Sequence, residues 1–323
     1  MGVNLSELAV TEPITFEFLN GKTLAVDALN MIYQFLGNIR QADGMPLMDS
    51  KGNVTSHLSG LFYRNINFLE KGMKLIYVFD GKPPDAKRSE LDSRGVARSS
   101  AKEKWDTALS EGRLEEAKKY AQRSSVVTDD MVNESKKLLD AMGIPVVQAL
   151  SEGEAQCAKV CQDGKAFASV TQDFDALLFG SPRTIRNLSV SKAETLHMMT
   201  LQNQKFTREQ FILMGILVGT DYNPGGVLGI GPKKALQMVE KCKTLEEIQK
   251  NIDWKFDLSP KEIFDFFMNP PVEEKYEIKF GKPDLERLRE ILCIEHEFSQ
   301  ERLEKNLDKL EKKKGGQTSL LGF

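Results

Sequence analysis

The sequence predicts an α/β protein with a mostly parallel central sheet flanked by helices. Four short segments, 23–27, 74–80, 145–150 and 166–172, are almost wholly apolar, and each ends in or is soon followed by a carboxylate. Strands that are buried on both faces read as such continuous apolar runs. The segments between them have helical spacing, so the chain alternates strand and helix as a parallel sheet requires.

The elements of the first half follow in order. Residues 28–39 have helical spacing and continue directly from the first strand. Residues 40–54 are rich in Gly, Pro and Asp, so an exposed loop is expected. A helix over 56–72, with Ser56 as its candidate cap and Gly72 at its end, leads into the second strand.

The second half is predicted to continue this alternation and then to become mostly helical from about residue 207. Thr128 marks the entry of one helix. Helices are expected over 129–142 and 152–163, and two charged amphipathic helices are expected within 284–312. Residues 184–190 are expected to be extended.

Residues 82–128 differ in kind from the rest. Within 82–123 there are eleven Lys or Arg against eight Asp or Glu, a net charge of +3, and no continuous hydrophobic face. One interpretation is a solvated helix with many salt bridges. The other is a mobile basic arch beside an acidic site, which its position directly after Asp80 favours.

Seven acidic residues stand where a strand or helix ends. Ligands of open parallel sheets bind beyond the carboxyl ends of the strands, so these side chains are expected to meet. Carboxylates at such short distances from one another cannot all stay ionised unless cations neutralise them. The predicted site therefore holds two divalent ions, which prefer oxygen ligands and suit displacement at phosphorus. Its members are Asp27, Asp80, Glu152, Glu154, Asp173, Asp175 and Asp221.

Taken one at a time, the same acids have structural explanations. Asp27 and Asp175 are suitable N-caps for the helices that follow them. Ser151 and Glu154 have the spacing of a capping box. The constellation of all seven is what favours a metal site.

The bulk composition excludes several classes. No run of apolar residues is long enough for a membrane span, and the first residues lack the pattern of a secretion signal. The four cysteines form no C-x-x-C pair, which favours small apolar residues in a reduced protein over a zinc site. The net charge is −3, but without the seven acids it is 44 − 40 = +4, so a nucleic-acid partner is compatible with the composition.

Basic and aromatic residues outside the acids suggest DNA contacts. Gly229 and Gly231 lie in a glycine-rich turn before a helix, and Lys233 and Lys234 follow at its start, a pattern that binds phosphate or simply connects two helices. Lys87 and Arg94 are seven residues apart and share a face if their segment is helical. They belong to a solvated surface or stabilise charge at a phosphate.

Two further features complete the candidates. Tyr33 lies on the helix after Asp27, either in the core or available to stack on a base. The Lys- and Gly-rich tail ends in a pattern that is typical of a docking peptide, made by Gln317, Leu320 and Phe323.

Several motifs together resemble the flap endonucleases of the structure-specific 5′ nuclease superfamily. They are AVDALNMIYQFL, YVFDGKPPDAKR, EGEAQCA, TQDFDALLFG, GTDYNPGGVLGIGPKKAL and NPPV, and the likeness runs nearly end to end. It implies a 5′ nuclease, PIN-like fold: a single nuclease domain over 1–311, with a helical arch at 82–128 and a helix-hairpin-helix element at 220–241. A flexible tail, 312–323, follows. Chain length and the lack of a long basic extension resemble archaeal members, which implies a cytoplasmic location; a eukaryotic member would be nuclear.

The resemblance also implies roles. Asp27, Asp80, Glu152 and Glu154 would lie near one Mg²⁺ and Asp173, Asp175 and Asp221 near the other, with Mn²⁺ as a substitute. Lys87 and Arg94 would be the basic pair at the foot of the arch, and Tyr33 would stack on a nucleobase. The hairpin would bind duplex DNA, in the family often with a monovalent cation such as K⁺. Gly2 would lie near the active site.

The implied activity is cleavage of DNA at 5′ flaps, with 5′–3′ exonuclease action, in Okazaki fragment maturation and repair. The implied partners are branched DNA and a sliding clamp, with no membrane and a monomeric state. The clamp motif departs from the family, because two adjacent aromatics are usual and here Phe323 follows Gly322.

Three alternatives remain open. The first is a non-catalytic DNA-junction scaffold, against which the complete acid set argues. The second is a Holliday-junction or bubble nuclease of the same superfamily; the compact 82–128 segment favours the flap enzyme. The third is a magnesium phosphatase, which leaves the hairpin and the basic segment unexplained.

Overall fold

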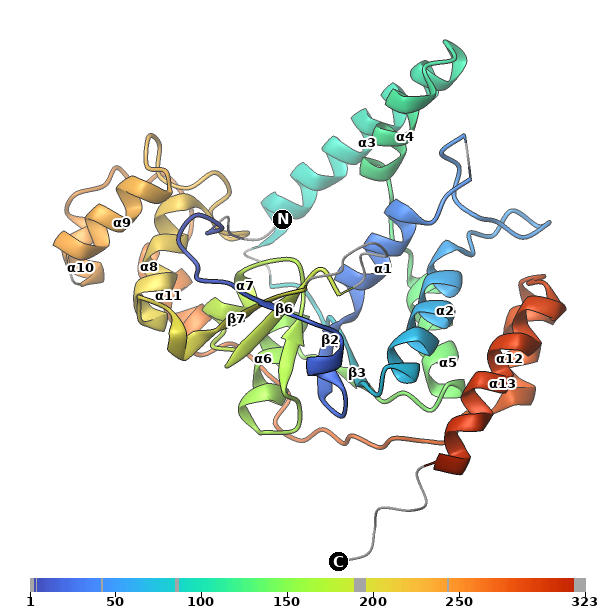
Figure 1. Ribbon diagram of the computed structural model, residues 1–323. Helices are drawn as coiled ribbons and strands as arrows, with labels where there is room; N and C mark the ends of the chain where they lie inside the picture. Colours follow the sequence, from blue (N-terminus) through green and yellow to red (C-terminus); the bar gives the residue numbers. More distant parts are fainter. Residues whose placement is uncertain are drawn as a thin grey trace, which may run out of the picture.

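The computed structural model describes residues 3, 5–41, 43–84, 87–188, 196–242 and 244–316. At its centre is a mixed seven-stranded sheet (Figure 1). Its strands are β1 (Glu12–Ile14), β2 (Thr23–Asp27), β3 (Lys74–Phe79), β4 (Val146–Gln148), β5 (Ala168–Val170), β6 (Arg183–Arg186) and β7 (Leu196–Thr200).

The strand order is β1-β7-β6-β5-β2-β3-β4. Strands β4, β3, β2, β5 and β6 pair in parallel, whereas β7 and β1 add an antiparallel edge. The predicted, mostly parallel sheet is therefore confirmed. The carboxyl ends of β2, β3, β4 and β5 lie on one edge, which places the residues after them side by side.

Helices cover both faces of the sheet. Helices α1 (Ala28–Asn38), α2 (Ser56–Glu70) and α5 (Asp129–Ala141) share a core with alternate strand residues such as Leu24 and Val26. On the other face, Ala25 packs with residues of α6 (Gly153–Gln162). Successive strand residues point to opposite faces, so both faces of β2 must be apolar.

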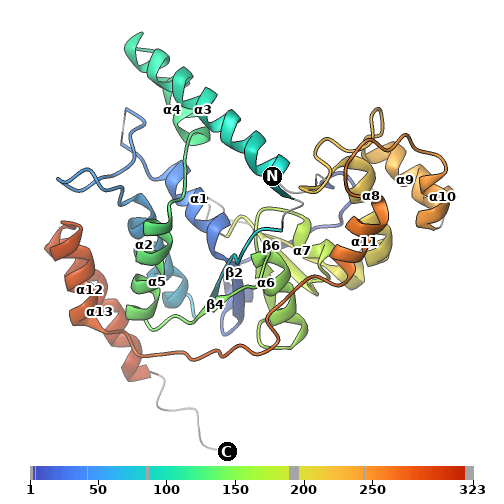
Figure 2. The same ribbon diagram turned by 180° about the vertical axis from the view of Figure 1, so that it is seen from behind.

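A second core lies beside the sheet (Figure 2). Phe211 and Phe267 are fully buried in it, and Phe179 packs 4.9 Å from Phe267 between ring centroids. Its helices are α7 (Asp175–Leu178), α8 (Arg208–Val218), α9 (Pro232–Lys241), α10 (Leu245–Gln249) and α11 (Pro260–Met268).

The arch is a pair of helices, α3 (Arg88–Ser110) and α4 (Leu114–Arg123), that projects from the body (Figures 1 and 2). The sequence shows no hydrophobic face here because the buried contacts are made by alanines, Ala101, Ala108, Ala117 and Ala121. Ion pairs such as Lys118–Glu115, at 3.3 Å, lie on the outside. The segment thus carries the salt bridges of the first interpretation, and its foot lies beside the acids as the second requires; the mobility of the arch stays a prediction.

The C-terminal helices α12 (Leu285–Arg289), η4 (Glu290–Glu295) and α13 (Gln300–Gly316) contribute Leu288, Leu292 and Leu303 to the first core. Residues 312–316, predicted as tail, continue α13 instead. Gln317, Leu320 and Phe323 lie outside the described residues, as does Gly2.

Two boundaries differ from expectation. Ser56 is not a helix cap; its hydroxyl donates to the Ile39 carbonyl at 2.6 Å, and Thr55 occupies the cap position. Residues 220–241, predicted as a helix-hairpin-helix element, hold one helix, α9, because α8 already ends at Val218. Nowhere in the described chain is a helix both long and apolar enough to cross a bilayer.

Candidate active site

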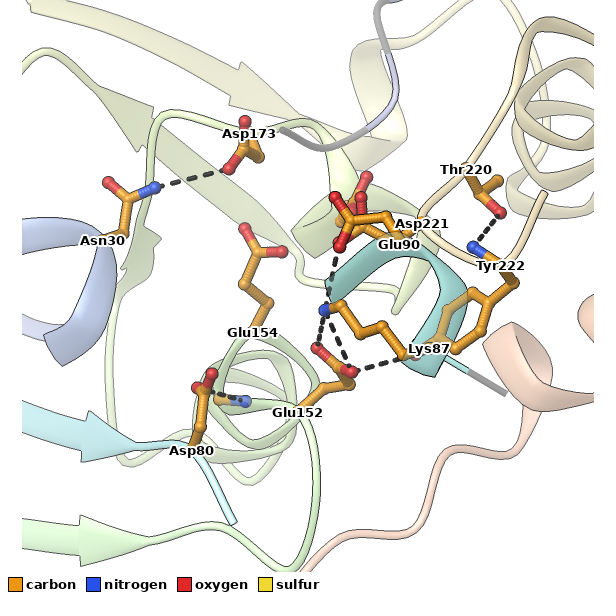
Figure 3. Close-up of polar contacts among 12 residues, drawn as sticks. Asn30, Asp80, Lys87, Glu90, Glu152, Glu154, Asp173, Thr220, Asp221 and Tyr222 are labelled. Atoms are coloured by element: carbon orange, nitrogen blue, oxygen red, sulfur yellow. Dashed lines mark hydrogen bonds and ion pairs between the residues drawn. The ribbon is translucent and has the colours of Figure 1, made fainter. Parts of the chain in front are cut away.

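Five of the seven predicted acids, Asp80, Glu152, Glu154, Asp173 and Asp221, lie near one another in Figure 3. Asp27 ends β2, Asp80 follows β3, Glu152 follows β4 and Asp173 follows β5. Burial, and next the charge of Asp80, raise the pKa of Asp27 well above its usual value; Asp173 and Glu152 act in the same direction. The four carboxylates are thus close enough for their charges to act on one another, and their role as metal ligands stays a prediction.

Asp80 is held by the backbone of the neighbouring turn. Its Oδ1 accepts a hydrogen bond from the Gly153 N–H at 2.9 Å. A Cβ at Gly153 would lie 2.3 Å from that same oxygen, so only glycine permits this approach. Burial and the charge of Glu152 raise the pKa of Asp80 to about 6, although Lys87 opposes the shift.

Glu154 and Asp173 are connected through a hydroxyl. Thr171 Oγ1 donates to Glu154 Oε1 at 2.6 Å and accepts from the Asp173 N–H at 3.2 Å. Asn30 Nδ2 approaches Asp173 Oδ2 at 3.4 Å. Burial, followed by the charges of Asp175 and Asp173, raises the pKa of Glu154 well above its usual value.

Asp175 is buried at the start of α7. Its Oδ1 accepts from the Val3 N–H at 2.9 Å, which ties the N-terminal segment to the site. Burial and the charges of Asp221 and Asp173 raise the pKa of Asp175 to about 7. An uncompensated carboxylate in this place binds a proton readily, and a divalent ion would replace that proton.

Lys87 and Arg94 reach the acids from the foot of the arch. Lys87 Nζ donates to both oxygens of Glu152, at 3.1 and 2.9 Å, and lies 3.0 Å from Asp221 Oδ2. Arg94 Nη2 donates to the same Asp221 oxygen at 2.9 Å. Burial acts to raise the pKa of Asp221, but Lys87 and Arg94 outweigh it, so the pKa is lowered. Lys87 stands at the N-cap of α3 and Arg94 lies within that helix, and both reach the same oxygen of Asp221.

The donor set fits hard divalent ions. Every member offers carboxylate oxygen. Four of them have raised pKa values, first because they are buried and second because other carboxylates lie nearby. Within the described residues no three acidic, His or Cys side chains already converge as a preformed ion site. Lys87 lies between Glu152 and Asp221 (Figure 3), where an ammonium group supplies part of the compensating charge.

Known proteins resemble the chain over its whole length. Residues 3–101 match the XPG N-terminal domain, and residues 143–221 match the XPG I-region. Flap endonuclease 1 of Pyrococcus furiosus is 50% identical over 338 aligned positions, covering 99% of this chain and 98% of that protein. This chain belongs to the flap endonuclease family. The flap endonuclease-1 structure from Methanococcus jannaschii has a TM-score of 0.80 and 38% identity, covering 98% of this chain and all of that one.

A DNA complex is also among the similar structures. The catalytic core of Rad2 with a DNA substrate has a TM-score of 0.73 at 25% identity, covering 93% of this chain and 96% of that one. The shared fold of the flap endonuclease family therefore extends to proteins seen with DNA.

The hairpin of this flap endonuclease family member has the geometry that the glycines predicted. Gly229 has φ +77° with open space around it, and Gly231 caps α9. Lys234 Nζ donates to the Gly229 carbonyl at 2.9 Å, whereas Lys233 is exposed. Leu228 stands 95% exposed at the tip. The turn thus carries two exposed lysines, and DNA binding there stays a prediction.

Tyr33 is part of the surface beside the site and not of the core. It is half-buried, and Arg98 of the arch donates to its hydroxyl at 3.0 Å with the guanidinium 5.2 Å from the ring centroid. A half-buried aromatic held by an arginine is available for stacking. Stacking itself stays a prediction.

The capping alternatives have mixed outcomes. Asp27 does cap α1, because its Oδ1 accepts from the Asn30 N–H at 3.0 Å. The capping box from Ser151 is wrong: Glu152 takes the cap position without a side-chain bond. Asp175 is also not a cap, since Phe174 precedes the helix and the carboxylate turns to Val3.

Several site residues were missed from the sequence. Tyr222 Oη donates to Glu152 Oε1 at 3.0 Å, and Glu90 forms an ion pair with Arg94. The i, i+4 spacing of Glu90 and Arg94 was a usable signal. Tyr222 directly follows Asp221 and Thr171 precedes the D-x-D pair, but nothing in the sequence says where a neutral hydroxyl points.

Proposed function

We propose that this chain is a structure-specific 5′ flap endonuclease that cleaves DNA near the junction of a single-stranded 5′ flap and duplex. The observation that carries the proposal is the meeting of seven carboxylates at one sheet edge, with Lys87 and Arg94 of the arch against them. The names of the family relatives agree with this activity. A 5′–3′ exonuclease action and a place in Okazaki fragment maturation and repair extend the same proposal.

The acids would hold two divalent ions, Mg²⁺ or Mn²⁺. When bound, such ions activate water as the nucleophile and stabilise the leaving oxygen. Asp27, Asp80, Glu152 and Glu154 would lie near one ion. Asp173, Asp175 and Asp221 would lie near the other.

The chain's own groups would position the substrate. Lys87 and Arg94 already meet anionic oxygen in the site, so they are placed to meet a phosphate as its charge develops. The hairpin with Lys233 and Lys234 would bind the duplex backbone, together with a K⁺ ion, and Tyr33 would stack on a base near the cut. The flap would pass by the arch.

A cleavage assay tests the proposal. Labelled flap, nicked, bubble and four-way DNA are incubated with the protein, with and without Mg²⁺. We expect cleavage of the flap substrate only with Mg²⁺, none by Asp173→Ala or Asp80→Ala, and DNA binding that is largely kept. Asp253→Ala is the matched control, because its carboxylate is exposed and forms an ion pair with Lys255. Unchanged turnover by Asp173→Ala would refute the role of the acids.

Three further points belong to the proposal. Gln317, Leu320 and Phe323 would dock on a sliding clamp, with an affinity limited by the missing second aromatic. A chain ending at residue 316 should lose clamp binding in surface plasmon resonance and keep flap cleavage.

We also propose a monomer, to be checked by light scattering, and a cytoplasmic location in an archaeal cell, to be checked by fractionation.

A further inference from the structure

The two glutamates after β4 each accept a hydrogen bond from a neutral hydroxyl. Tyr222 Oη donates to Glu152 Oε1 at 3.0 Å, and Thr171 Oγ1 donates to Glu154 Oε1 at 2.6 Å. Tyr222 is 7% exposed and Thr171 is 2% exposed. A buried hydroxyl without a hydrogen-bond partner destabilises the folded protein, so each of these hydrogen bonds favours the observed orientation of its glutamate.

The direction of the Tyr222 hydroxyl is set by the second core. Its ring centroid lies 4.7 Å from that of Phe266 and 5.7 Å from that of Phe267, both on α11. Its backbone N–H donates to Thr220 Oγ1 at 3.1 Å (Figure 3). The turn that supplies Asp221 therefore also supplies a donor for a glutamate from another part of the chain.

Thr171 connects two pairs of acids. Its hydroxyl donates to Glu154 and accepts the Asp173 N–H at 3.2 Å, so one oxygen sets the distance between the turn after β4 and the turn after β5. The β-branched side chain is stiff at χ1, which limits the alternatives for this oxygen.

We propose that Thr171 and Tyr222 are positioning residues that hold Glu154 and Glu152 in the orientation that a divalent ion requires. The inference rests on the proposed function, because it takes the two glutamates to be ion ligands. Groups that hydrogen-bond to metal ligands fix ligand orientation before the ion arrives, and their loss weakens metal affinity about 10–100-fold.

The test for Thr171 uses two variants and Mn²⁺ alone. Thr171→Val keeps the shape and removes the hydroxyl, whereas Thr171→Ser keeps the hydroxyl. Free Mn²⁺ is measured by its electron paramagnetic resonance signal without DNA. We expect about 10–100-fold weaker Mn²⁺ binding in the Val variant and rescue in the Ser variant. Thr184→Val is the matched control, because Thr184 is buried and its Oγ1 has no hydrogen-bond partner within the described part of the chain.

Tyr222→Phe makes the parallel test. We expect weaker Mn²⁺ binding and a higher Mg²⁺ concentration for half-maximal flap cleavage. Tyr276→Phe is its control, since that hydroxyl donates to Asp163 Oδ2 at 2.7 Å away from the acids. Thermal unfolding in EDTA shows whether each variant is folded.

The outcomes separate the two proposals. Wild-type protein that binds no Mn²⁺ and cleaves no flap would overturn the proposed function and this inference with it. Wild-type protein that binds Mn²⁺, together with Thr171→Val and Tyr222→Phe proteins that bind it as tightly as their controls, would overturn the inference alone. Weak binding by Thr171→Ser as well as by Thr171→Val would also count against it, because volume and not the hydroxyl would then matter.

Discussion

Nζ of Lys87 lies 3.0 Å from Oδ2 of Asp221, so the foot of the arch is joined to the turn after α8. Arg94 donates to the same oxygen, and Lys87 also donates to Glu152. The foot of the arch thus meets the acids through ion pairs. Removal of one partner of such an ion pair strongly destabilises the folded protein, because the charge of the other partner stays buried without compensation.

Replacement of Lys87 tests this relationship. We expect Lys87→Ala to lower kcat for flap cleavage about 10²–10³-fold, as the loss of a group that stabilises developing charge does. In EDTA its Tm should also fall, and Mg²⁺ should raise that Tm by more than it raises the wild-type Tm. Single-turnover kinetics and calorimetry measure the two effects. Lys82→Ala, an exposed lysine between β3 and the arch, is the control and should behave as wild type.

Ionisation of Asp175 should make the metal-free protein less stable as the pH rises. The folded pKa is raised to about 7 from the usual 3.8, so the unfolded chain loses its proton first. The stability that this group contributes is complete below about pH 4 and lost as the pH rises through about 7. Asp175→Asn cannot ionise, and its amide oxygen can still accept the Val3 N–H.

We therefore expect the Tm of Asp175→Asn minus that of wild type, measured in EDTA, to increase from pH 4 to pH 8. Saturating Mg²⁺ should reverse the order at pH 8, because the ion stabilises only the carboxylate form. A Tm difference that stays flat across this range in EDTA would contradict the raised pKa.

Gly153 permits the contact that holds Asp80. In Gly153→Ala the new methyl group would meet Asp80 Oδ1 at 2.3 Å, so the carboxylate has to turn away. We expect a loss of cleavage close to that of Asp80→Ala with DNA binding kept. Gly164→Ala is the control, because Gly164 follows the same helix and a methyl group there would have no atom within 4 Å. Its φ of +70° means that this control also includes the backbone strain of placing alanine in a glycine position. Wild-type cleavage by Gly153→Ala would show that the Asp80 position is not critical.

Lys233 is expected to contact a DNA phosphate. Each lost phosphate contact changes the slope of log affinity against log salt by about 0.9 on duplex DNA. Lys233→Gln should therefore weaken flap-DNA binding at low salt and flatten that slope by about this amount, as measured by fluorescence anisotropy. Lys261→Gln serves for comparison, because Lys261 is exposed on α11 and forms an ion pair with Asp265. Equal slopes for both variants would remove Lys233 from the interface.

The sequence by itself determined the strands and the acids at their ends. Buried parallel strands have to be apolar along their whole length, so the first polar residue marks the edge where Asp27 and Asp80 emerge. The spacing of Lys87 and Arg94 put them on one face if their segment was helical, and the helix begins only after Lys87. The end of α13 and the caps at Ser56 and Ser151 were less well predicted, because local propensity is easily overruled by tertiary contacts.

Only the tertiary structure decided which donors meet which acids. Tyr222 and Thr171 are neutral residues in ordinary positions, and their partners lie on other elements, so no spacing in the chain encodes the contact. The same holds for Gly153, whose missing side chain matters because Asp80 comes from the neighbouring strand. The sequence gives the residue type and chain position of each acid directly, whereas the orientation of its oxygens depends on packing between distant segments.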